Sequence, residues 1–270
     1  MSVTYSILNI TIKTEDSLSV FQGFEITRHD KKESEIICKF KNTSADNQCY
    51  GIQYVPKKDM EAIKSIFFSQ KDKTHYLYSS KDDYSKLCLK HDGNCGEDVL
   101  LELFLVGFYS YVASKDTLFM HASAVEYQGK SIVFAAPSGI GKTTQAELWA
   151  KYKGAVILNG DKVFLKREDD GIHAWGSPWK GSSPYAENAS APLRAIVALE
   201  QAEENRIRKL EGLEVLEYVV PHVFFPAWDE RCEQAVLTFL DQVLGETEVY
   251  LLKCRPDKEA VELLASTIKE

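Results

Sequence analysis

Residues 136–143, Ala-Pro-Ser-Gly-Ile-Gly-Lys-Thr, have types and spacing that could hold a polyphosphate. Gly139 and Gly141 permit a tight turn that directs consecutive backbone N–H groups toward phosphate oxygens. The segment matches the phosphate-binding loop pattern in its relaxed form, with alanine at the first glycine position. The pattern predicts that Lys142 reaches the β- and γ-phosphates of a nucleotide and that Thr143 holds Mg²⁺. The residues expected to bind the nucleotide are Ser138, Gly139, Ile140, Gly141, Lys142, Thr143 and Thr144.

A carboxylate, Asp161, follows the next apolar run of strand length, residues 155–158. Ligands of open α/β sheets bind where the strands end, so this carboxylate is expected near the γ-phosphate. It could accept a proton from an attacking hydroxyl or bind the metal through water. The alternative is an aspartate that only caps a turn after Asn-Gly.

His121 interrupts an otherwise apolar or small-residue stretch on the strand expected to pair with the one that leads into the loop. Its ring needs a polar partner, and it could orient Asp161 or contact a phosphate. A hydrogen-bonded core histidine is the alternative. We therefore expect Asp161, His121 and Lys142 to be catalytic, and Thr143 and Asp161 to bind the metal.

Strands and one helix must position these residues. The apolar pattern predicts strands over residues 118–126 and 130–136, a helix over 143–152, and a strand over 155–158. Strand, glycine-rich loop, helix and strand form a βαβ unit. Further strands are expected over residues 193–199 and 249–253, and helices over 225–244 and 257–268.

The first 95 residues alternate apolar and polar positions between turn-prone clusters, which favours a β-rich module. Strands are expected over residues 6–13, 35–41 and 75–78, and a short helix within 57–68. From residue 96 the pattern changes, and residues 97–109 predict a mostly buried helix. We therefore expect two parts, a β-rich module of unknown role over residues 1–95 and a catalytic core over residues 96–270.

Several other segments have less specific patterns. Residues 174–183 hold two tryptophans and a lysine in an expected loop, which could form an acceptor site or a phosphate-contacting flap. A surface hairpin with one tryptophan packed beneath it is the alternative. Glu187, Asn188 and Arg194 are weaker candidates for metal or acceptor binding, and His222 has apolar neighbours typical of a structural residue.

Composition excludes some classes of function. The net charge of −8 argues against binding a nucleic acid, which needs a basic face. No apolar run approaches the ~20 residues that cross a bilayer, and the N-terminus lacks the pattern of a signal peptide. We expect a cytoplasmic protein with no membrane partner, and a homo-oligomer is compatible with the sequence. Six cysteines without a CxxC pair are expected to be reduced thiols.

The motifs combine as His121-x-x-x-Val125-x-x-x-Gly129-Lys130, then Ala136-Pro137-Ser138-Gly139-x-Gly141-Lys142-Thr143-Thr144, then Asn159-Gly160-Asp161-Lys162-Val163. This pattern resembles the catalytic core of HPr kinase/phosphorylase. It is more similar to the smaller HPr-kinase-like bacterial enzymes, some of which are serine kinases acting on peptide tails or small molecules. The resemblance covers roughly residues 119–199, with a looser match at 250–257, and does not extend to residues 1–95.

The resemblance implies an α/β fold, with a P-loop kinase core of the HPr-kinase/PEP-carboxykinase type beside the β-rich N-terminal module. It implies a functional histidine at His121 and an acidic general base at Asp161. The family has two adjacent aspartates here, whereas this chain has Gly160 and Asp161. The family's acidic residue before Ile-Arg-Gly is unmatched at residues 193–196, so kinase activity without phosphorylase activity is expected.

Together these features predict a kinase that uses ATP and Mg²⁺ and transfers the γ-phosphoryl group to a hydroxyl. The acceptor would be serine in a peptide or protein, or a small molecule. One alternative is a regulatory module that binds a nucleotide and catalyses nothing. A hydrolase or a PEP-carboxykinase-like enzyme is a weaker alternative, because the metal-binding His and Lys set of the carboxykinases is not evident.

Overall fold

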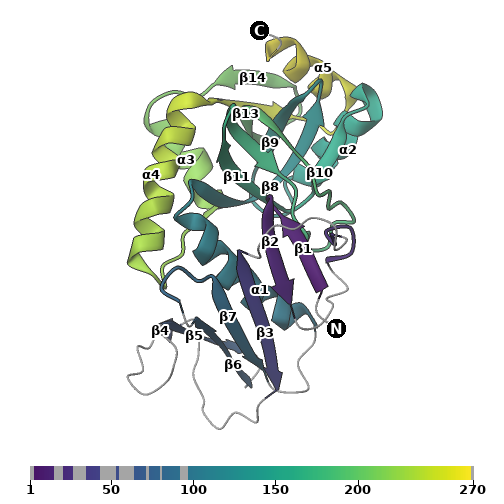
Figure 1. The fold of residues 1–270 in the computed structure, drawn as a ribbon. Helices are drawn as coiled ribbons and strands as arrows, with labels where there is room; N and C mark the ends of the chain where they lie inside the picture. Colours follow the sequence, from purple (N-terminus) through teal and green to yellow (C-terminus); the bar gives the residue numbers. More distant parts are fainter. Residues whose placement is uncertain are drawn as a thin grey trace. The chain divides into compact units, whose positions relative to one another are not determined.

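The computed structural model describes residues 3–14, 21–26, 35–42, 53–54, 64–70, 73–79, 81–91 and 97–268. The chain has a mixed α/β architecture and divides into two compact units (Figure 1). Unit 1 comprises Met1–Lys115 and Pro226–Val236, and unit 2 comprises Asp116–Phe225 and Leu237–Glu270.

Unit 1 contains a seven-stranded sheet in the order β1-β2-β3-β7-β6-β5-β4. Its strands are β1 (Val3–Ile7), β2 (Ile10–Thr14), β3 (Ile36–Asn42), β4 (Gln53–Tyr54), β5 (Lys64–Gln70), β6 (Lys73–Ser79) and β7 (Lys86–His91). The pairs β2–β3 and β3–β7 are parallel, and the other pairs are antiparallel. Buried aromatic rings, including Tyr5, Phe21 and Phe104, form part of its core.

Two expectations for this part of the chain are corrected. The single strand expected over residues 6–13 is a hairpin, because Leu8 and Asn9 have φ values of 54° and 61° and turn the chain. The helix expected within residues 57–68 is wrong over residues 64–68, which lie in β5 and pair along its length with β6. Strand β5 forms a hairpin with β6, which follows it directly in the chain, and the hydrogen bonds of this pair override the local helical pattern. Residues 57–63 lie outside the described residues.

Helix α1 (Glu97–Ala113) forms where a buried helix is expected. It contacts β6 and β7, and it belongs to unit 1 for that reason. The division between the units therefore falls after Lys115 rather than at the expected residue 95, and it also assigns residues 226–236 to unit 1.

Unit 2 is built on a nine-stranded sheet in which strand β8 is central. Its strands are β8 (Thr117–Tyr127), β9 (Lys130–Ala135), β10 (Val156–Asn159), β11 (Lys162–Glu168), β12 (Gly171–Trp175), β13 (Ser190–Gln201), β14 (Arg206–Lys209), β15 (Val223–Phe224) and β16 (Glu248–Cys254). Strands β8, β11, β12, β13 and β9 pair in a closed ring. Strands β9, β13 and β16 run parallel, so their carboxyl ends lie at one edge.

The α-helices after α1 are α2 (Lys142–Lys153), α3 (Leu213–Val219), α4 (Glu230–Glu246) and α5 (Lys258–Thr267). A buried cluster joins α2 and α5 to the sheet through Trp149, Phe134 and Leu264. The expected βαβ unit is present as β9, α2 and β10. Both strands pair antiparallel with β8, which lies between them. Helix α4 begins at Glu230 rather than at residue 225, after Pro226 and a cap at Asp229.

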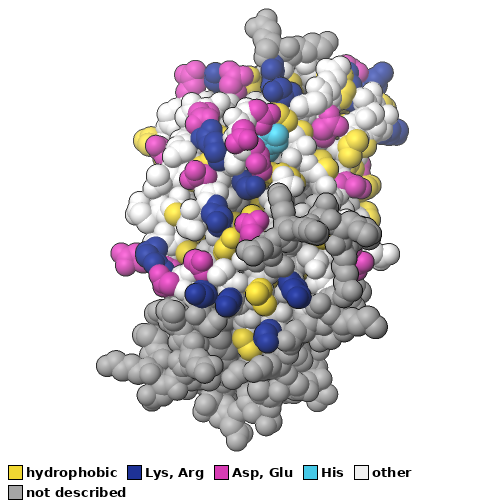
Figure 2. Space-filling model, viewed as in Figure 1, with side chains coloured by type: hydrophobic (Ala, Val, Ile, Leu, Met, Phe, Trp, Pro, Cys, Tyr) yellow, Lys and Arg dark blue, Asp and Glu magenta, His cyan; other side chains and the backbone are white. Residues whose placement is uncertain are grey.

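No helix among the described residues is long and apolar enough to cross a membrane. On the face shown in Figure 2, acidic and basic side chains are interspersed over the described surface and do not separate into a field of one sign.

Gly176 fixes how the segment after β12 packs against β10. A Cβ at Gly176 would overlap the carbonyl oxygens of Glu187 and Leu158, which are backbone atoms and cannot rotate away. We expect Gly176→Ala to destabilise unit 2 by about 1–3 kcal/mol. Gly245→Ala is the matched control, because its Cβ would meet nothing within 4 Å and alanine favours the helix by up to about 1 kcal/mol. Urea unfolding followed by tryptophan fluorescence measures both, and equal stability of the two variants would contradict this packing.

Candidate functional site

The glycine-rich loop, residues 136–141, connects β9 to α2. Gly139 and Gly141 have φ values of 82° and 122°, which L side chains rarely adopt, so the turn requires glycine at both positions. The first turn of α2 is held to the sheet by the buried Ser123, whose hydroxyl donates to the Lys142 carbonyl oxygen at 2.8 Å. The loop is therefore anchored at both ends while Ser138 and Gly139 stay exposed.

Lys142 is buried, with 7 % of its surface exposed. Its ammonium group donates to the Ala136 carbonyl oxygen at 2.9 Å and to that of Pro137 at 3.4 Å, so it folds back across the loop. Burial lowers its pKa, and the negative charge of Asp161 opposes that shift. A buried ammonium group held by two carbonyl oxygens would be stabilised by an anion in the loop.

Asp161 and His121 form a hydrogen-bonded pair, in which Nε2 of His121 lies 3.0 Å from Oδ1 of Asp161. The hydrogen bond from His121 is the main cause of the lowered pKa of Asp161, assisted by the positive charges of Lys162 and Lys142 and opposed by burial. The carboxylate is therefore ionised near neutral pH. Both side chains keep some exposure, 25 % for Asp161 and 33 % for His121.

The fully buried Asn159 sets the backbone on which Asp161 lies. Its Oδ1 accepts from the backbone N–H groups of Asp161 and Lys162, each at 2.8 Å. Its Nδ2 donates to the carbonyl oxygens of Ser177 at 2.9 Å and Trp179 at 3.1 Å. One amide thus joins the Asp161 turn to the segment after β12. The sequence interpretation did not assign this role, and an asparagine directly after an apolar strand run is the signal that could have indicated it.

Residues 176–183, called the covering loop below, lie against this turn. The Trp179 ring packs on Phe164 with centroids 6.0 Å apart, and Trp179 is only 3 % exposed. A Cβ at Gly181 would overlap the Asp161 carboxylate, so the backbone of this loop passes directly over it. The segment expected as either a flap or a surface hairpin is a strand that ends at Trp175 and a loop that follows it, and Trp175 and Trp179 are both buried.

The hydroxyl of Thr143 donates to the Gly160 carbonyl oxygen at 2.9 Å, which brings the start of α2 next to the Asp161 turn. A Cβ at Gly160 would overlap the Ser183 hydroxyl, so a larger residue does not fit at this position without movement. Thr143 and Asp161 thus both lie beside the loop, and hydroxyl and carboxylate oxygens are the atom types that a hard cation such as Mg²⁺ prefers. Among the described residues, no group of three or more His, Cys, Asp or Glu side chains could hold a metal by itself.

His222, interpreted from sequence as structural, lies close to the site. It directly precedes β15, in which Val223 pairs with Met120 and Phe224 with Phe119. The rings of Phe164, Phe119 and Phe224 stack across three adjacent strands, with neighbouring centroids 4.8 and 4.5 Å apart.

In a strand, residues two positions apart point to the same face of the sheet. Lys162, His121 and His222 are each two positions from one of these phenylalanines, so they form a second row on that face, with Lys162 opposite His121. Burial lowers the pKa of half-buried His222, and the charges of Lys142 and His121 add to the shift. The pairing of β15 with β8 links segments about 100 residues apart in the chain, which no local sequence pattern reveals.

A cavity of about 450 Å³ opens beside the loop at the carboxyl ends of β9, β13 and β16. It is lined by loop residues 139–141, by Thr144 and Gln145, and by residues 199–202 and 254–256. Ligands of α/β sheets bind at such strand ends, and the volume suits a nucleoside.

The weaker candidates do not join the site. The side chains of Glu187 and Asn188 are exposed, although the Glu187 backbone N–H donates to the Leu158 carbonyl oxygen at 2.9 Å. Arg194 lies toward the other end of β13 and lines a separate cavity. Four cysteines fall in the described part of the chain, at positions 38, 88, 232 and 254, and all are free thiols. Cys49 and Cys95 lie outside it.

Comparison with known proteins gives a distant structural likeness. No family model and no curated protein matches the chain. Among solved structures, the chain is similar to the Hpr(Ser) kinase/phosphatase from Coxiella burnetii, with 10% sequence identity and a TM-score of 0.35. The match covers 56% of this chain and 95% of that chain.

The His121–Asp161 pair gives a prediction that needs no ligand. Removing the hydrogen bond in His121→Ala should raise the pKa of Asp161, because that bond is the main cause of its lowered value. Carboxyl ¹³C NMR titration measures the shift. His173→Ala is the matched control, since its ring pairs with Asp170 at 2.7 Å and should affect the pKa of Asp170 alone. An unchanged Asp161 titration in His121→Ala would contradict the pairing.

Proposed function

We propose that this chain binds ATP with Mg²⁺ and transfers the γ-phosphoryl group to an alcohol hydroxyl, such as that of serine in a peptide, protein or small molecule. One observation carries the proposal. The buried Lys142 of the glycine-rich loop interacts electrostatically with Asp161, which is itself bonded to His121. A phosphate-binding cation and an ionised carboxylate that accepts the hydroxyl proton are groups that phosphoryl transfer to a hydroxyl uses.

Nucleotide binding would use the loop and the adjoining cavity. The exposed backbone of the loop and the positive end of α2 favour the phosphates, and the ammonium group of Lys142 would exchange its two carbonyl partners for phosphate oxygens. The 450 Å³ cavity at the strand ends would take the nucleoside. Thr143 and Asp161 would hold Mg²⁺, which when bound neutralises charge on the phosphates.

In the transfer, the acceptor oxygen forms a bond to the γ-phosphorus while the bond from that phosphorus to the β–γ bridging oxygen breaks. The hydroxyl proton passes to Asp161, and ADP leaves with the electron pair of the broken bond. A carboxylate with a lowered pKa is a weak base, so its main role would be to orient the hydroxyl. Orientation dominates here because the transition state of phosphoryl transfer is largely dissociative.

The proposal includes a P-loop kinase core of the HPr-kinase type, resting on the motifs of residues 119–199. Where that family has two adjacent aspartates, this chain has Gly160 and Asp161, and the neighbouring Ser183 hydroxyl fills the space that a side chain at position 160 would need. One carboxylate therefore serves both as metal ligand and as base in the proposed reaction. The family's acidic residue before Ile-Arg-Gly is also unmatched at residues 193–196, which supports a kinase without phosphorylase activity.

The roles of Lys142 and Asp161 predict different defects. Lys142→Ala should weaken ATP binding at least about tenfold, because it removes a charge-assisted contact. Asp161→Asn keeps a side-chain oxygen that can face Mg²⁺, so it should leave ATP binding nearly unchanged while lowering turnover by about 10²–10⁴-fold. Calorimetry measures binding, and transfer of labelled phosphate to free serine, peptides and sugars measures turnover. Lys151→Ala, which changes an exposed lysine of the same helix, should alter neither quantity.

The outcomes separate the proposed kinase from a regulatory module. Binding lost with Lys142 but no ADP above the uncatalysed rate with any acceptor would favour a nucleotide sensor. Full turnover in Asp161→Asn would contradict the role of the carboxylate.

His222 should make nucleotide binding depend on pH. Its pKa is lowered in the free protein by burial and by the charges of Lys142 and His121, so the ring is neutral at pH 7. Bound phosphates add negative charge, which favours the protonated ring, so binding should take up a proton and strengthen as the pH falls from 8 to 6. Calorimetry in buffers of different ionisation enthalpy measures this uptake. We expect less uptake in His222→Gln than in wild type, and no change in the distant His173→Gln. Equal uptake in all three proteins would exclude His222 from the site.

A further inference from the structure

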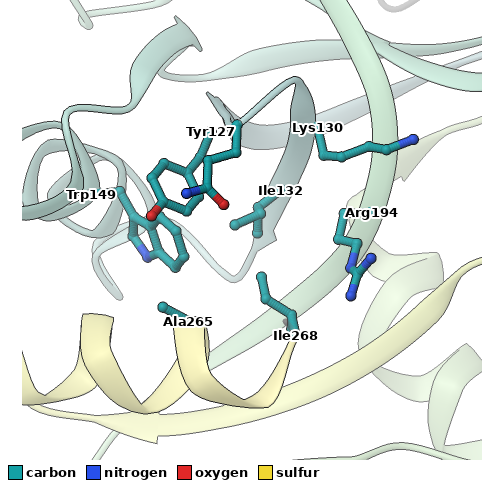
Figure 3. A pocket seen from close by; sticks show the side chains of 8 residues that line it. Tyr127, Lys130, Ile132, Trp149, Arg194, Ala265 and Ile268 are labelled. Atoms are coloured by element: carbon teal, nitrogen blue, oxygen red, sulfur yellow. The ribbon is translucent and has the colours of Figure 1, made fainter. Parts of the chain in front are cut away.

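Unit 2 contains a second cavity, at the ends of β9 and β13 opposite to the glycine-rich loop. Its volume is about 200 Å³, and it lies between the turn that joins β8 to β9 and the last turn of α5. Figure 3 shows the rings of Tyr127 and Trp149 at one end, Lys130 and Arg194 at the other, and Ile132 and Ile268 between them. The cavity thus has an aromatic end, an apolar middle and a basic end.

The basic end carries charge that this part of the protein does not neutralise. Within the described residues, neither Lys130 nor Arg194 forms an ion pair. Asp170 lies close enough to interact with the charge of Lys130, but it is paired with His173 at 2.7 Å.

Glu248 interacts in the same way with Arg194, but it is paired with Lys209 at 2.6 Å. Two cations therefore line one end of this cavity in a chain whose net charge is −8, and the Lys130 side chain extends outward from it (Figure 3). Because Asp170 and Glu248 are paired elsewhere, they would compete little with a bound anion for Lys130 and Arg194.

The aromatic end offers a flat apolar surface and an unused donor. The rings of Tyr127 and Trp149 meet edge to face, with centroids 5.4 Å apart. Trp149 is fully buried, and its indole N–H has no hydrogen-bond partner in the described structure. Buried indole N–H groups usually have a partner, so this donor is an exception that calls for a ligand or an ordered water.

We propose that this cavity binds a small monoanion with one ring, of the class of aromatic carboxylates. A cavity of 150 Å³ lined by apolar side chains holds a benzene ring, so about 200 Å³ suits one ring with one anionic group. The ring would lie against Trp149 and Ile132, and the carboxylate would face Arg194 and Lys130. This site is separate from the nucleotide site and does not depend on the proposed kinase activity.

The location of the cavity means that a bound ligand would contact the two elements that flank the glycine-rich loop. Helix α2 runs from Lys142 to Lys153 and carries Trp149, while β9 starts at Lys130 and leads directly into the loop. A ligand in the cavity therefore contacts both elements that hold the loop in place.

Benzoate is the test ligand, added to the full chain, with benzamide as the uncharged analogue and acetate as the anion without a ring. The chain has four tryptophans, so the indole N–H resonances in a ¹H–¹⁵N NMR spectrum are few, and Trp149→Phe assigns the relevant one. We expect benzoate to shift the Trp149 resonance saturably, benzamide to bind at least about tenfold more weakly, and acetate to have no saturable effect.

Arg194→Gln should weaken benzoate binding at least about tenfold, because it removes a charge-assisted contact. The matched control is Arg206→Gln, an exposed arginine of β14 paired with Glu204 at 2.5 Å, and its affinity should equal that of wild type. Circular dichroism confirms that each variant is folded. The proposal is overturned if benzoate causes no saturable shift of the Trp149 resonance, if benzamide binds as well as benzoate, or if Arg194→Gln binds as wild type does.

Discussion

The candidate site depends on the pairing of one strand, β8, with two strands along each of its sides. On one side, β9 ends with Ala135 opposite Ala122, and β15 begins with Val223 opposite Met120. On the other side, β10 ends opposite Ala124 and β11 begins opposite His121. On each side of β8, one paired strand thus ends and another begins near residues 120–124. The glycine-rich loop leaves the sheet on one side at this level and the Asp161 turn bends away on the other, so both meet around His121.

Several polar groups in this region are held by hydrogen-bond partners inside the fold. Asn159 supplies a carbonyl oxygen to the Asp161 turn and an amide to the covering loop, and Ser123 ties the first turn of α2 to β8. Such a network fixes positions because an unpaired buried polar group would cost about 1–3 kcal/mol. Lys142 differs from these neutral groups because it carries a charge. Its buried ammonium group is bonded only to neutral carbonyl oxygens, so its positive charge is not neutralised by them and can still attract an anion.

The sequence predicts the part of the site that is local in the chain. The glycine-rich loop, the strands and helix that flank it, and the meeting of Asp161 with His121 follow from patterns within about 45 residues. Local turn chemistry is harder to predict: Leu8 and Asn9 fit an alternation of apolar and polar residues that is typical of one strand, although they form the turn of a hairpin.

Features set by distant segments could not be predicted. The position of His222 depends on the register of a two-residue strand, and the covering loop depends on an amide that bonds to carbonyl groups about 20 residues away. Neither leaves a periodic signal, because a single cross-strand pair or side-chain bond has no repeat along the chain. The apolar neighbours of His222 in the sequence therefore predict a structural residue. In the fold, His222 lies on the same face of the sheet as His121 and Lys162.

A crystal structure of the chain with Mg²⁺ and a non-hydrolysable ATP analogue tests the nucleotide site most directly. The predicted result is a triphosphate along Gly139 to Thr144, with Lys142 turned away from its two carbonyl partners and the terminal phosphate facing Asp161. A nucleotide bound elsewhere, with those residues in contact with no phosphate, would contradict it.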